Sequence, residues 1–471
     1  MLRLHDTATG TVTPLELREP GRVAIYVCGL TVYDVPHLGN GRPAMVFDIL
    51  RRYLIFSGLD VTHVSNITDV DDQIINRSRE QGLSEGELAA IYEQVWWDAV
   101  DALGILRPDE VPHATAFIER MVSFIEELVE RGVAYETNDG VYLSVDAVPG
   151  YGLLAHQPLH SLLAGARVEI DEEKRSPLDF VLWKKAKAGE PTWPSPFGPG
   201  RPGWHTECVV MSLDLLGDGF EIHGGGFDLA FPHHENERAQ AVAAGHSFAR
   251  HWMHNGFLMT GGEKMSKSLG NFTSLSDLIE QRDPRAYRLL TLQAHYRSPV
   301  EVTQETIAQA EGALDRLDEM ARRLLPATDD PRVVVPAVVD PTAGAGTGSE
   351  DIDTDAVSRF RERMDDDLDT PNAMAGIFEL VREANSAADA GDDGRALRAA
   401  ATVRLLCGVL GLALGGGSDE ELDVETADRV RRRDEARAAA DWAQADALRD
   451  ELQAAGWLVE DSSSGTRVRR R

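Results

Sequence analysis

The alternation of short apolar runs with helix-like segments near the N-terminus constrains the fold of this chain more than any other feature. Residues 23–28 (Val-Ala-Ile-Tyr-Val-Cys) form an apolar run that is typical of a buried strand and opens into a loop at Gly29. Residues 45–54 then carry apolar side chains at the helical period, and residues 61–67 form a second strand candidate. Strands that alternate with helices indicate βαβ units, so we predict an α/β fold with a Rossmann-like parallel sheet.

The rest of the chain divides by composition and periodicity into further segments. At 471 residues the chain is longer than one hydrophobic core normally supports, so we predict several domains. The predicted divisions are a Rossmann-like domain over 1–255 with an insertion at about 115–195, a lysine-containing loop region over 256–305, a helical bundle over 306–414 in which 326–356 is mobile, and a small tail domain over 422–471.

The compartment follows from what the sequence lacks. No signal-peptide pattern opens the chain and no apolar run approaches the length of a membrane span, so we expect a soluble, cytoplasmic protein without membrane contact. Cys28, Cys208 and Cys407 are too few and too scattered for a disulfide framework. These cysteines are therefore predicted to be either small buried hydrophobic residues or metal ligands.

The charge is strongly negative overall but not in the tail. A formal net charge of −31 opposes nonspecific binding to polyanions. Residues 426–471, however, hold ten Arg against nine Asp plus Glu, with arginine clusters at 431–433 and 469–471. Such clusters indicate either a contact with nucleic acid or a solvated helix end, and composition alone leaves both interpretations open.

One motif places hydrogen-bond donors at the start of the first long helix. In residues 28–40, His37, Gly39 and Asn40 come after the first strand and before a helix expected to start near Arg42. Free backbone N–H groups and the helix dipole favour an anion at that point. A purely structural histidine in a turn is the alternative interpretation.

Two glycine-containing stretches have the composition of nucleotide-binding loops. Residues 261–271 (Gly-Gly-Glu-Lys-Met-Ser-Lys-Ser-Leu-Gly-Asn) contain two of the six lysines in the chain. Lys264 and Lys267 are compact charges that suit phosphate, although a polar surface loop would have the same composition. In residues 223–237, three glycines open a surface for a flat ligand, and Asp228 is suited to accept hydrogen bonds from ribose hydroxyls.

The second of these stretches also contains candidate metal ligands. His233 and Glu237 are four residues apart after Pro232, so on a helix their side chains share a face. With Cys28 and Cys208 they would supply two thiolates, an imidazole and a carboxylate, all of which zinc accepts. Because no Cys-x-x-Cys pair is present, two buried cysteines beside a polar helix start remain the alternative.

Taken together, these motifs resemble a known family. The stretches His37-Leu-Gly-Asn and Lys264-Met-Ser-Lys-Ser resemble the paired signatures of class I aminoacyl-tRNA synthetases. Further stretches are similar to cysteinyl-tRNA synthetases in particular. They are Tyr-Val-Cys-Gly at 26–29, Thr-Val-Tyr-Asp at 31–34, Asn-Ile-Thr-Asp-Val-Asp-Asp at 66–72, Gly-Trp-His-Thr-Glu-Cys at 203–208, Phe-Pro-His-His-Glu-Asn-Glu at 231–237, Asp-Trp-Ala at 441–443 and Arg-Asp-Glu-Leu at 449–452.

The resemblance implies an activity and a set of ligands. It implies that the chain activates L-cysteine with ATP to cysteinyl adenylate, releasing pyrophosphate, and transfers the cysteine to the 3′ end of tRNA-Cys. The implied partners are L-cysteine, ATP with Mg2+, tRNA-Cys and one Zn2+, in a monomeric protein. The region 256–305 would contact the tRNA stem, and the tail over 422–471 would contact the anticodon with Trp442 and nearby arginines.

The resemblance also assigns roles to individual residues. The implied catalytic residues are His37, Asn40, Lys264 and Lys267; the ATP contacts are Lys267, His37, Asn40 and Asp228; the cysteine contacts are Thr68 and Trp204; and the zinc ligands are Cys28, Cys208, His233 and Glu237. Four protein ligands normally close a tetrahedral zinc site, so the substrate thiol must add a ligand or displace a weak one. We expect Glu237 to be the weak ligand.

Three positions depart from common patterns. Asn40 stands where other class I synthetases have a second histidine, as is usual for the cysteine branch. Leu30 and Phe227 stand where the family more often has proline and serine. Two other functions share some of these motifs: a ligase that joins cysteine to an amino-sugar in thiol-cofactor synthesis, and an inactive relative that binds zinc or RNA. The residues beyond Gly415 and the presence of Glu237 argue against the first, and His37 with the two lysines argues against the second.

Overall fold

The structure is a computed structural model, and its parts fold as two compact units. It describes residues 1–156, 173–264, 274–325, 352–415, 423–439, 441–462 and 465–470. Residues 1–414 form the first unit and residues 415–471 the second. Lys267 and most of the 326–356 segment lie outside the described residues.

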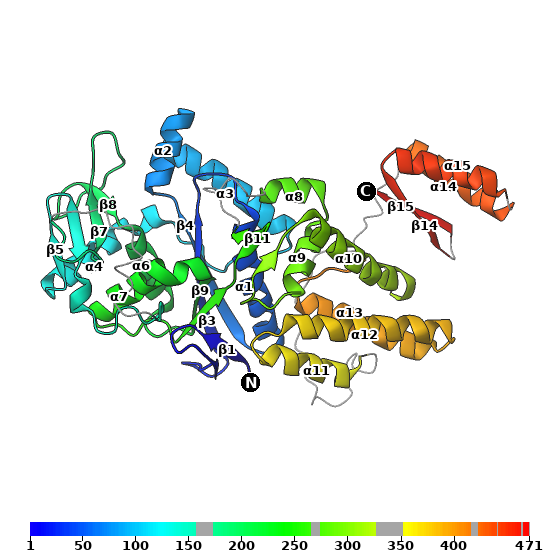
Figure 1. The fold of residues 1–471 in the computed structure, drawn as a ribbon, viewed down its shortest axis with the longest axis horizontal. Helices are drawn as coiled ribbons and strands as arrows, with labels where there is room; N and C mark the ends of the chain where they lie inside the picture. Colours follow the sequence, from blue (N-terminus) through cyan, green and yellow to red (C-terminus); the bar gives the residue numbers. More distant parts are fainter. Residues whose placement is uncertain are drawn as a thin grey trace. The chain divides into compact units, whose positions relative to one another are not determined.

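A four-stranded parallel sheet forms the centre of the first unit (Figure 1). Its strand order is β10-β9-β3-β4, with every neighbouring pair parallel. The strands are β3 (Arg22–Thr31), β4 (Asp60–Thr68), β9 (Ile222–Gly226) and β10 (His251–Asn255). The predicted α/β fold with a parallel sheet is therefore confirmed.

Helices cover both faces of this sheet. Strand side chains alternate between the two faces, so successive apolar residues of β3 pack into different cores. Ile25 and Val27 pack with Phe47 of α1 (Leu38–Phe56) on one face. On the other face, Tyr26 shares a core with Val209 of α6 (Trp204–Leu216), and with α7 (Glu235–Ala243).

Helix α1 begins earlier than the sequence pattern indicated. The prediction placed its start near Arg42, but the first helical residue is Leu38 and His37 is the N-cap. Gly39, Gly41 and Pro43 are poor helix formers, so the first turn carries no clear helical signature. The early start puts the His37–Asn40 motif on the helix terminus itself.

The remaining elements of the N-terminal half surround the sheet. A hairpin of β1 (Arg3–Asp6) and β2 (Thr11–Pro14) precedes β3, and α2 (Asp72–Gln81) and α3 (Glu85–Ala102) follow β4. Next come η1 (Ala114–Phe117), α4 (Ile118–Glu130) and η2 (Val145–Ala147). An antiparallel sheet in the order β5-β6-β7-β8 occupies the predicted insertion; its strands are β5 (Ala134–Glu136), β6 (Gly140–Leu143), β7 (Phe180–Lys185) and β8 (Gly200–Pro202).

The C-terminal half of the first unit is mainly helical. After β10, a small sheet is made by β11 (Leu258–Thr260), β12 (Glu263–Lys264) and β13 (Val300–Glu301). The helices are α8 (Leu275–Gln281), α9 (Pro284–Leu292), α10 (Gln304–Leu324), α11 (Thr354–Asp365), α12 (Thr370–Asp389) and α13 (Asp393–Val409). β13 lies between α9 and α10, and its two residues are too few to show a strand period in the sequence.

The second unit contains two helices and a hairpin. They are α14 (Val424–Ala438), α15 (Trp442–Ala454), β14 (Trp457–Ser462) and β15 (Gly465–Arg470). Leu452, Trp457 and Val459 form its small core. Arg433 is buried and donates to Thr466 Oγ1 at 2.6 Å, so one member of the arginine cluster at 431–433 holds α14 to β15 instead of facing solvent.

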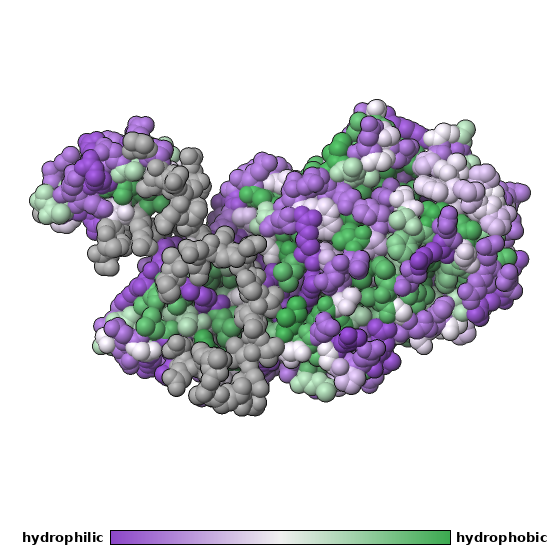
Figure 2. Space-filling model, turned by 180° about the vertical axis from the view of Figure 1, so that it is seen from behind, coloured by the Kyte–Doolittle hydropathy of each residue, from purple (hydrophilic) through white to green (hydrophobic). Residues whose placement is uncertain are grey.

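The surface is mixed in character. Figure 2 shows hydrophilic residues over much of one side of the molecule, with small hydrophobic groups between them. Large hydrophobic side chains that are exposed in the described parts of the chain are scattered, and two of them, Trp204 and Phe227, lie at the site described below. No described helix combines the length and the apolar character needed to cross a membrane.

Candidate active site

A pocket opens at the carboxyl ends of the central parallel strands. Its cavity volume is about 380 Å³, and residues from β3, the start of α1, the start of α6 and the turn after β9 line it. Ligands of open parallel α/β sheets bind at this edge, because the loops that leave the strands form a crevice there. Of the predicted site residues, the lining includes Cys28, His37, Asn40, Trp204 and Asp228.

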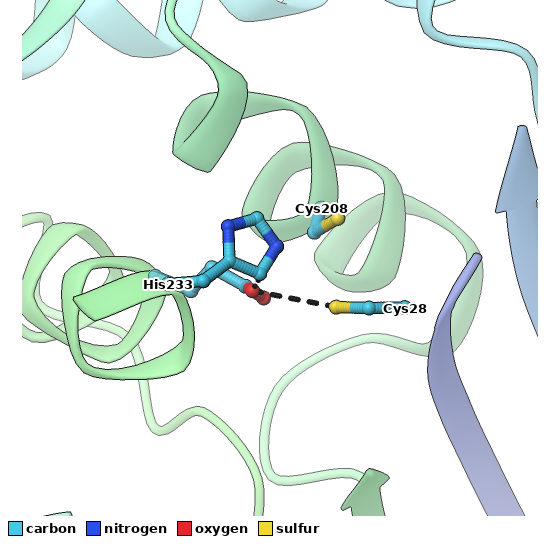
Figure 3. A group of neighbouring side chains, drawn as sticks. Cys28, Cys208 and His233 are labelled. Carbon is cyan, nitrogen blue, oxygen red and sulfur yellow. Dashed lines mark hydrogen bonds and ion pairs between the residues drawn. The ribbon is translucent and has the colours of Figure 1, made fainter. Parts of the chain in front are cut away.

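The four predicted metal ligands meet beside this pocket (Figure 3). The candidate ligand atoms of Cys28, Cys208, His233 and Glu237 all lie within 4.8 Å of one another. The Cys28 thiol donates to Glu237 Oε1 at 3.4 Å, and His233 Nε2 lies 3.0 Å from the same oxygen. Residues separated by up to 209 positions thus converge on one point.

Three packed elements deliver these side chains. Cys28 is near the end of β3, and Cys208 is on α6. His233 is the fourth residue of the irregular turn η4 (Ala230–His234), which runs into α7 and Glu237. Although Phe231 breaks the helical geometry inside η4, His233 and Glu237 still share a face, as their spacing predicted.

The sequence interpretation missed His223, which lies on the other side of Glu237. His223 Nε2 is 3.0 Å from Glu237 Oε2, and Cys28, His223, His234 and Glu237 form a second group of closely spaced ligand atoms. His223 also stacks on Tyr26 at a ring distance of 5.3 Å. Only the pairing of β9 with β3 brings His223 to within 3.8 Å of the Cys28 thiol.

The electrostatics of the cluster suit a cation. Contact with the Cys28 thiol lowers the pKa of Cys208 to about 6, while burial raises the pKa of Cys28. Burial opposes the charged forms of Glu237 and His233, but the neighbouring groups together outweigh it. Glu237 and Cys208 raise the pKa of His233 to about 10, and His223 with His233 holds the pKa of Glu237 well below its usual range. The cluster therefore holds anionic donors in a buried place.

The donor set fits zinc on a second observation. His233 Nε2 and Glu237 Oε2 are buried and lie 3.0 Å from Glu237 Oε1 and His223 Nε2 respectively, but among the described residues neither contact has the geometry of a hydrogen bond. Buried polar atoms normally have partners, so two such atoms in a group of thiol, imidazole and carboxylate indicate a place for a metal. Sulfur and nitrogen donors select a borderline-soft ion such as zinc over magnesium or calcium.

Of the two residues predicted to contact the amino acid, one lines the pocket and the other does not. The Trp204 side chain lines the pocket and stacks on His233 with ring centroids 3.8 Å apart. Thr68 is buried behind the lining, where its hydroxyl donates to Glu207 Oε2 at 2.9 Å and accepts from Asn66 Nδ2 at 3.2 Å. Burial raises the pKa of Glu207 well above its usual range.

Asn66 organises the strand ends around this network, although its role was not predicted. Its Oδ1 accepts from the Tyr26 hydroxyl at 3.1 Å and from the Gly29 backbone N–H at 2.9 Å. The same oxygen lies 3.7 Å from Cys208 Sγ. Asn66 thus connects β4, β3 and α6 directly behind the pocket.

The first signature motif forms the opposite wall. Asn40 Oδ1 accepts from the His37 backbone N–H at 3.0 Å, which caps α1 and leaves the Asn40 amide group as a donor at the pocket lining. A Cβ atom on Gly39 would lie 2.6 Å from the His37 ring, so this ring position requires glycine. His37 and Asn40 are therefore at a helix N-terminus, as predicted.

The described part of the second motif lies against the turn after β9. Lys264 Nζ is 3.2 Å from Asp228 Oδ2 in η3 (Phe227–Leu229) and 4.3 Å from the centre of the Phe257 ring. Chain residues 265–273, including Lys267, are outside the described part, and the first residue after them, Ser274, pairs with His37 through the backbone. Lys264 therefore contacts a residue of the pocket lining, and Ser274 lies beside the first motif.

Phe227, one of the departures from the family pattern, extends this wall. It is 54% exposed and meets Phe257 nearly edge-on, with ring centroids 6.1 Å apart and an interplanar angle of 75°. Because Phe257 also carries Lys264 on its ring, the aromatic pair lies beside the ion pair between Lys264 and Asp228.

Comparisons with known proteins agree with this geometry. A family model described as the class I (C) tRNA synthetase catalytic domain matches residues 14–312, and a DALR domain model matches residues 359–415. The structure of Mycobacterium tuberculosis methionyl-tRNA synthetase in complex with methionyl-adenylate superimposes with a TM-score of 0.58 at 17% identity, covering 83% of this chain and 89% of that one. The chain has the fold of a class I tRNA synthetase and carries the catalytic domain of that class.

Full-length relatives narrow the assignment. The cysteine--tRNA ligases of Alkalilimnicola ehrlichii and Halorhodospira halophila are each 46% identical to this chain over 480 residues, covering 100% of both chains in each case. That of Methylococcus capsulatus is 45% identical over 483 residues, again over the whole of both chains. The chain belongs to the cysteine--tRNA ligase family.

Proposed function

We propose that this protein activates L-cysteine with ATP and transfers the cysteinyl group to the 3′ end of tRNA-Cys. The observation that carries the proposal is a pocket lined by Cys28 of the buried Cys/His/Glu cluster, by His37 and Asn40 of the first signature motif, and by Asp228, which pairs with Lys264 of the second. A thiol-bearing substrate would face the cluster, and a triphosphate would face the helix terminus and the lysines.

The chemistry of activation needs positioning and charge stabilisation more than acid–base groups. A carboxylate oxygen of cysteine forms a bond to the α-phosphorus of ATP, and the bond to the pyrophosphate oxygen breaks. His37 and the Asn40 amide would donate to phosphate oxygens, aided by the positive end of the α1 dipole. The reacting atoms would be held close together, which contributes much of the rate enhancement. Mg2+ is expected to accompany the ATP.

The lysines would act on the departing pyrophosphate. Lys264 contacts Asp228 across the pocket mouth, and we propose that it exchanges this contact for a phosphate when ATP binds. Asp228 would then be released to accept from the ribose hydroxyls. Lys267, outside the described residues, is proposed as the main direct ATP contact. Glycines at 261 and 262 have positive φ angles and permit the hairpin turn that carries this loop.

Selection of cysteine over serine is assigned to the buried cluster. We propose that Cys28, Cys208, His233 and Glu237 hold one Zn2+, which would bind the substrate thiol and discriminate against a hydroxyl. Glu237 is proposed as the weak ligand, because it also pairs with His223 and therefore has an alternative partner. Trp204 would cover the amino acid, and the Thr68–Glu207 hydrogen bond would position the strand end beneath it.

Recognition of tRNA is assigned to the helical region and the second unit. The DALR match covers α12 and α13, and the second unit carries Trp442, whose side chain is exposed on α15. Anticodon bases are read by stacking and by hydrogen bonds to their edges, which an exposed tryptophan and nearby arginines supply. We expect the protein to act as a cytoplasmic monomer, which size-exclusion chromatography with light scattering would check for the oligomeric state.

The decisive experiment is ATP–pyrophosphate exchange with cysteine and with serine, followed by charging of a tRNA-Cys transcript. Cysteine-dependent exchange together with charging would support the proposal. Exchange without charging would instead favour the ligase that joins cysteine to an amino-sugar. Absence of exchange from metal-replete protein would contradict enzymatic activation altogether.

A further inference from the structure

Arg42 has an unusual environment for a buried cation. Its side chain is on α1, only two residues after Asn40, and it is 1% exposed. In the part of the chain that the structure describes, no carboxylate forms an ion pair with it. Burying an unpaired charge is costly unless hydrogen bonds compensate for it, so a purely packing role would be served better by an apolar residue.

Four backbone carbonyls take the place of a counter-ion. Nη1 donates to Gly256 O at 2.8 Å and to Phe257 O at 2.7 Å. Nη2 donates to Tyr296 O at 3.2 Å and to Ser298 O at 2.5 Å. Burial lowers the pKa of Arg42 only to about 10, so the guanidinium is charged at neutral pH.

These carbonyls belong to the two segments that lead into β11 and β13. The two strands are parallel neighbours, and the segments also bond directly, through Gly256 N to Tyr296 O at 2.8 Å and Val300 N to Phe257 O at 3.0 Å. The segments approach so closely that a Cβ atom on Gly256 would lie 2.5 Å from Arg297 O. Arg42 therefore sits where the small sheet that bears the lysine hairpin is joined to the rest of the unit.

The contacts continue from this junction to the pocket. Phe257, whose carbonyl Arg42 holds, carries on its ring the ammonium group of Lys264 and packs against Phe227. Arg42 also belongs to the start of α1, where His37 is the N-cap and Asn40 is in the first turn. One side chain thus connects the helix that presents the first signature motif to the base of the hairpin that presents the second.

We propose that Arg42 is a positioning residue that sets the distance between the two signature motifs, so that the lysines reach the phosphates held at the α1 terminus. The inference rests on the proposed function. Only a guanidinium suits the task, because its planar fork donates to two segments at once, whereas an ammonium is a single point charge. A small displacement of the hairpin base would misplace both lysines relative to ATP, and misplacement by about 1 Å can cost about 100-fold in rate.

The test is Arg42→Lys in the full-length protein, which keeps the charge. We expect kcat/KM for ATP in pyrophosphate exchange to fall about 10- to 100-fold. The KM for cysteine and the zinc content should remain within about twofold of wild type, because the buried cluster lies on the other face of the central sheet. A general structural defect would change all three quantities together.

Arg51→Lys is the matched control. Arg51 is on the same helix, is also buried, and donates to Arg107 O at 2.7 Å and Asp109 Oδ1 at 2.6 Å, away from the hairpin. Its replacement should lower thermal stability without a selective change in the ATP parameter. Equal ATP effects in the two variants would overturn the inference.

Gly256→Ala approaches the same junction from the other side. We expect the same selective loss in kcat/KM for ATP, and a double variant with Arg42→Lys that is less impaired than the two single effects multiplied, because both changes disturb one contact. If the losses in kcat/KM of the two single variants multiplied in the double variant, Arg42 and Gly256 would act independently and not through one contact. If the wild-type protein itself shows no cysteine-dependent exchange, the proposed function fails; if the wild type is active and Arg42→Lys is unchanged, only the Arg42 inference fails.

Discussion

The two walls of the pocket are built in opposite ways. The wall that carries Cys208, His233 and Glu237 is buried, and each of these side chains is held by elements of the sheet and its covering helices. The wall that carries Lys264 is a glycine-bearing hairpin, where the Lys264 and Asp228 side chains are 42% and 52% exposed. Selecting one amino acid needs fixed geometry, whereas admitting ATP and releasing pyrophosphate needs a contact that can open.

The largest effect is expected when one of the proposed zinc ligands is removed from the buried wall. Cys208→Ser should lower kcat/KM for cysteine by more than about 1000-fold and abolish the preference over serine, because binding and selection both depend on the cluster. Metal titration should show that the affinity for zinc falls by more than the 10- to 100-fold loss that is typical when a partner of a metal ligand is removed.

Cys407→Ala is the control for this prediction. Cys407 is also buried but lies in the core around α13, outside the cluster. The variant should lose stability without losing zinc or selectivity. If Cys208→Ser retained stoichiometric zinc and full preference for cysteine, the assignment of the buried wall would be wrong.

The next largest effect is expected on the hairpin wall. Lys267→Ala should lower kcat for pyrophosphate exchange by about 100- to 1000-fold, the loss typical of one transition-state donor, and Lys264→Ala should have a smaller effect. Zinc content should not change in either variant. Lys187→Ala, in the loop after β7, is the control and should match the wild type; a fall in zinc content in the lysine variants would show that the two walls are not independent.

A moderate effect on the KM for cysteine is expected from a change at Thr68, at the end of β4. Thr68→Val removes the hydrogen bond to Glu207 and leaves a buried carboxyl without that donor, which typically costs about 1–3 kcal/mol. We expect the KM for cysteine to rise about tenfold while the KM for ATP is unchanged. Thr62→Val, at an exposed position of the same strand, should alter neither value. If only the KM for ATP rose, the assignment of Thr68 to the wall that contacts cysteine would be wrong.

The smallest effect is expected at Phe227. Phe227→Ser restores the residue more common in the family and removes an exposed edge-on contact, which is worth about 0.5–1.5 kcal/mol at most. The KM for ATP should change by no more than about tenfold, with the cysteine parameters constant. Isothermal titration with a non-hydrolysable ATP analogue would measure the change directly, and a larger loss would mean that Phe227 is a main contact for the nucleotide.

Much of the site was predictable because its signals are local. The four-residue spacing of His233 and Glu237 depends only on helix geometry, and the glycine and histidine of the first motif depend only on the turn between a strand and a helix. The order of the motifs along the chain indicated the family, and full-length relatives confirm it. The roles of the individual residues remain predictions that the experiments above address.

Other features depended on contacts between distant segments. Nothing near His223 in the sequence indicated that it would face Glu237, and nothing near Arg42 indicated four carbonyls from segments more than 200 residues away. The burial of Arg433 against Thr466 likewise follows from a hairpin that the tail sequence did not predict. Patterns along the chain report which face of an element is apolar, but not which partner that face meets.

The sequence by itself determined the α/β class, the motif order and the four-residue spacing that puts His233 and Glu237 on one face, because backbone preferences and side-chain periodicity act over a few residues. Only the tertiary structure decided that β9 lies beside β3, that His223 of β9 pairs with Glu237 of α7, and that Arg42 holds the hairpin base. Those arrangements depend on how whole elements pack, and packing is a property of the assembled core rather than of any one segment.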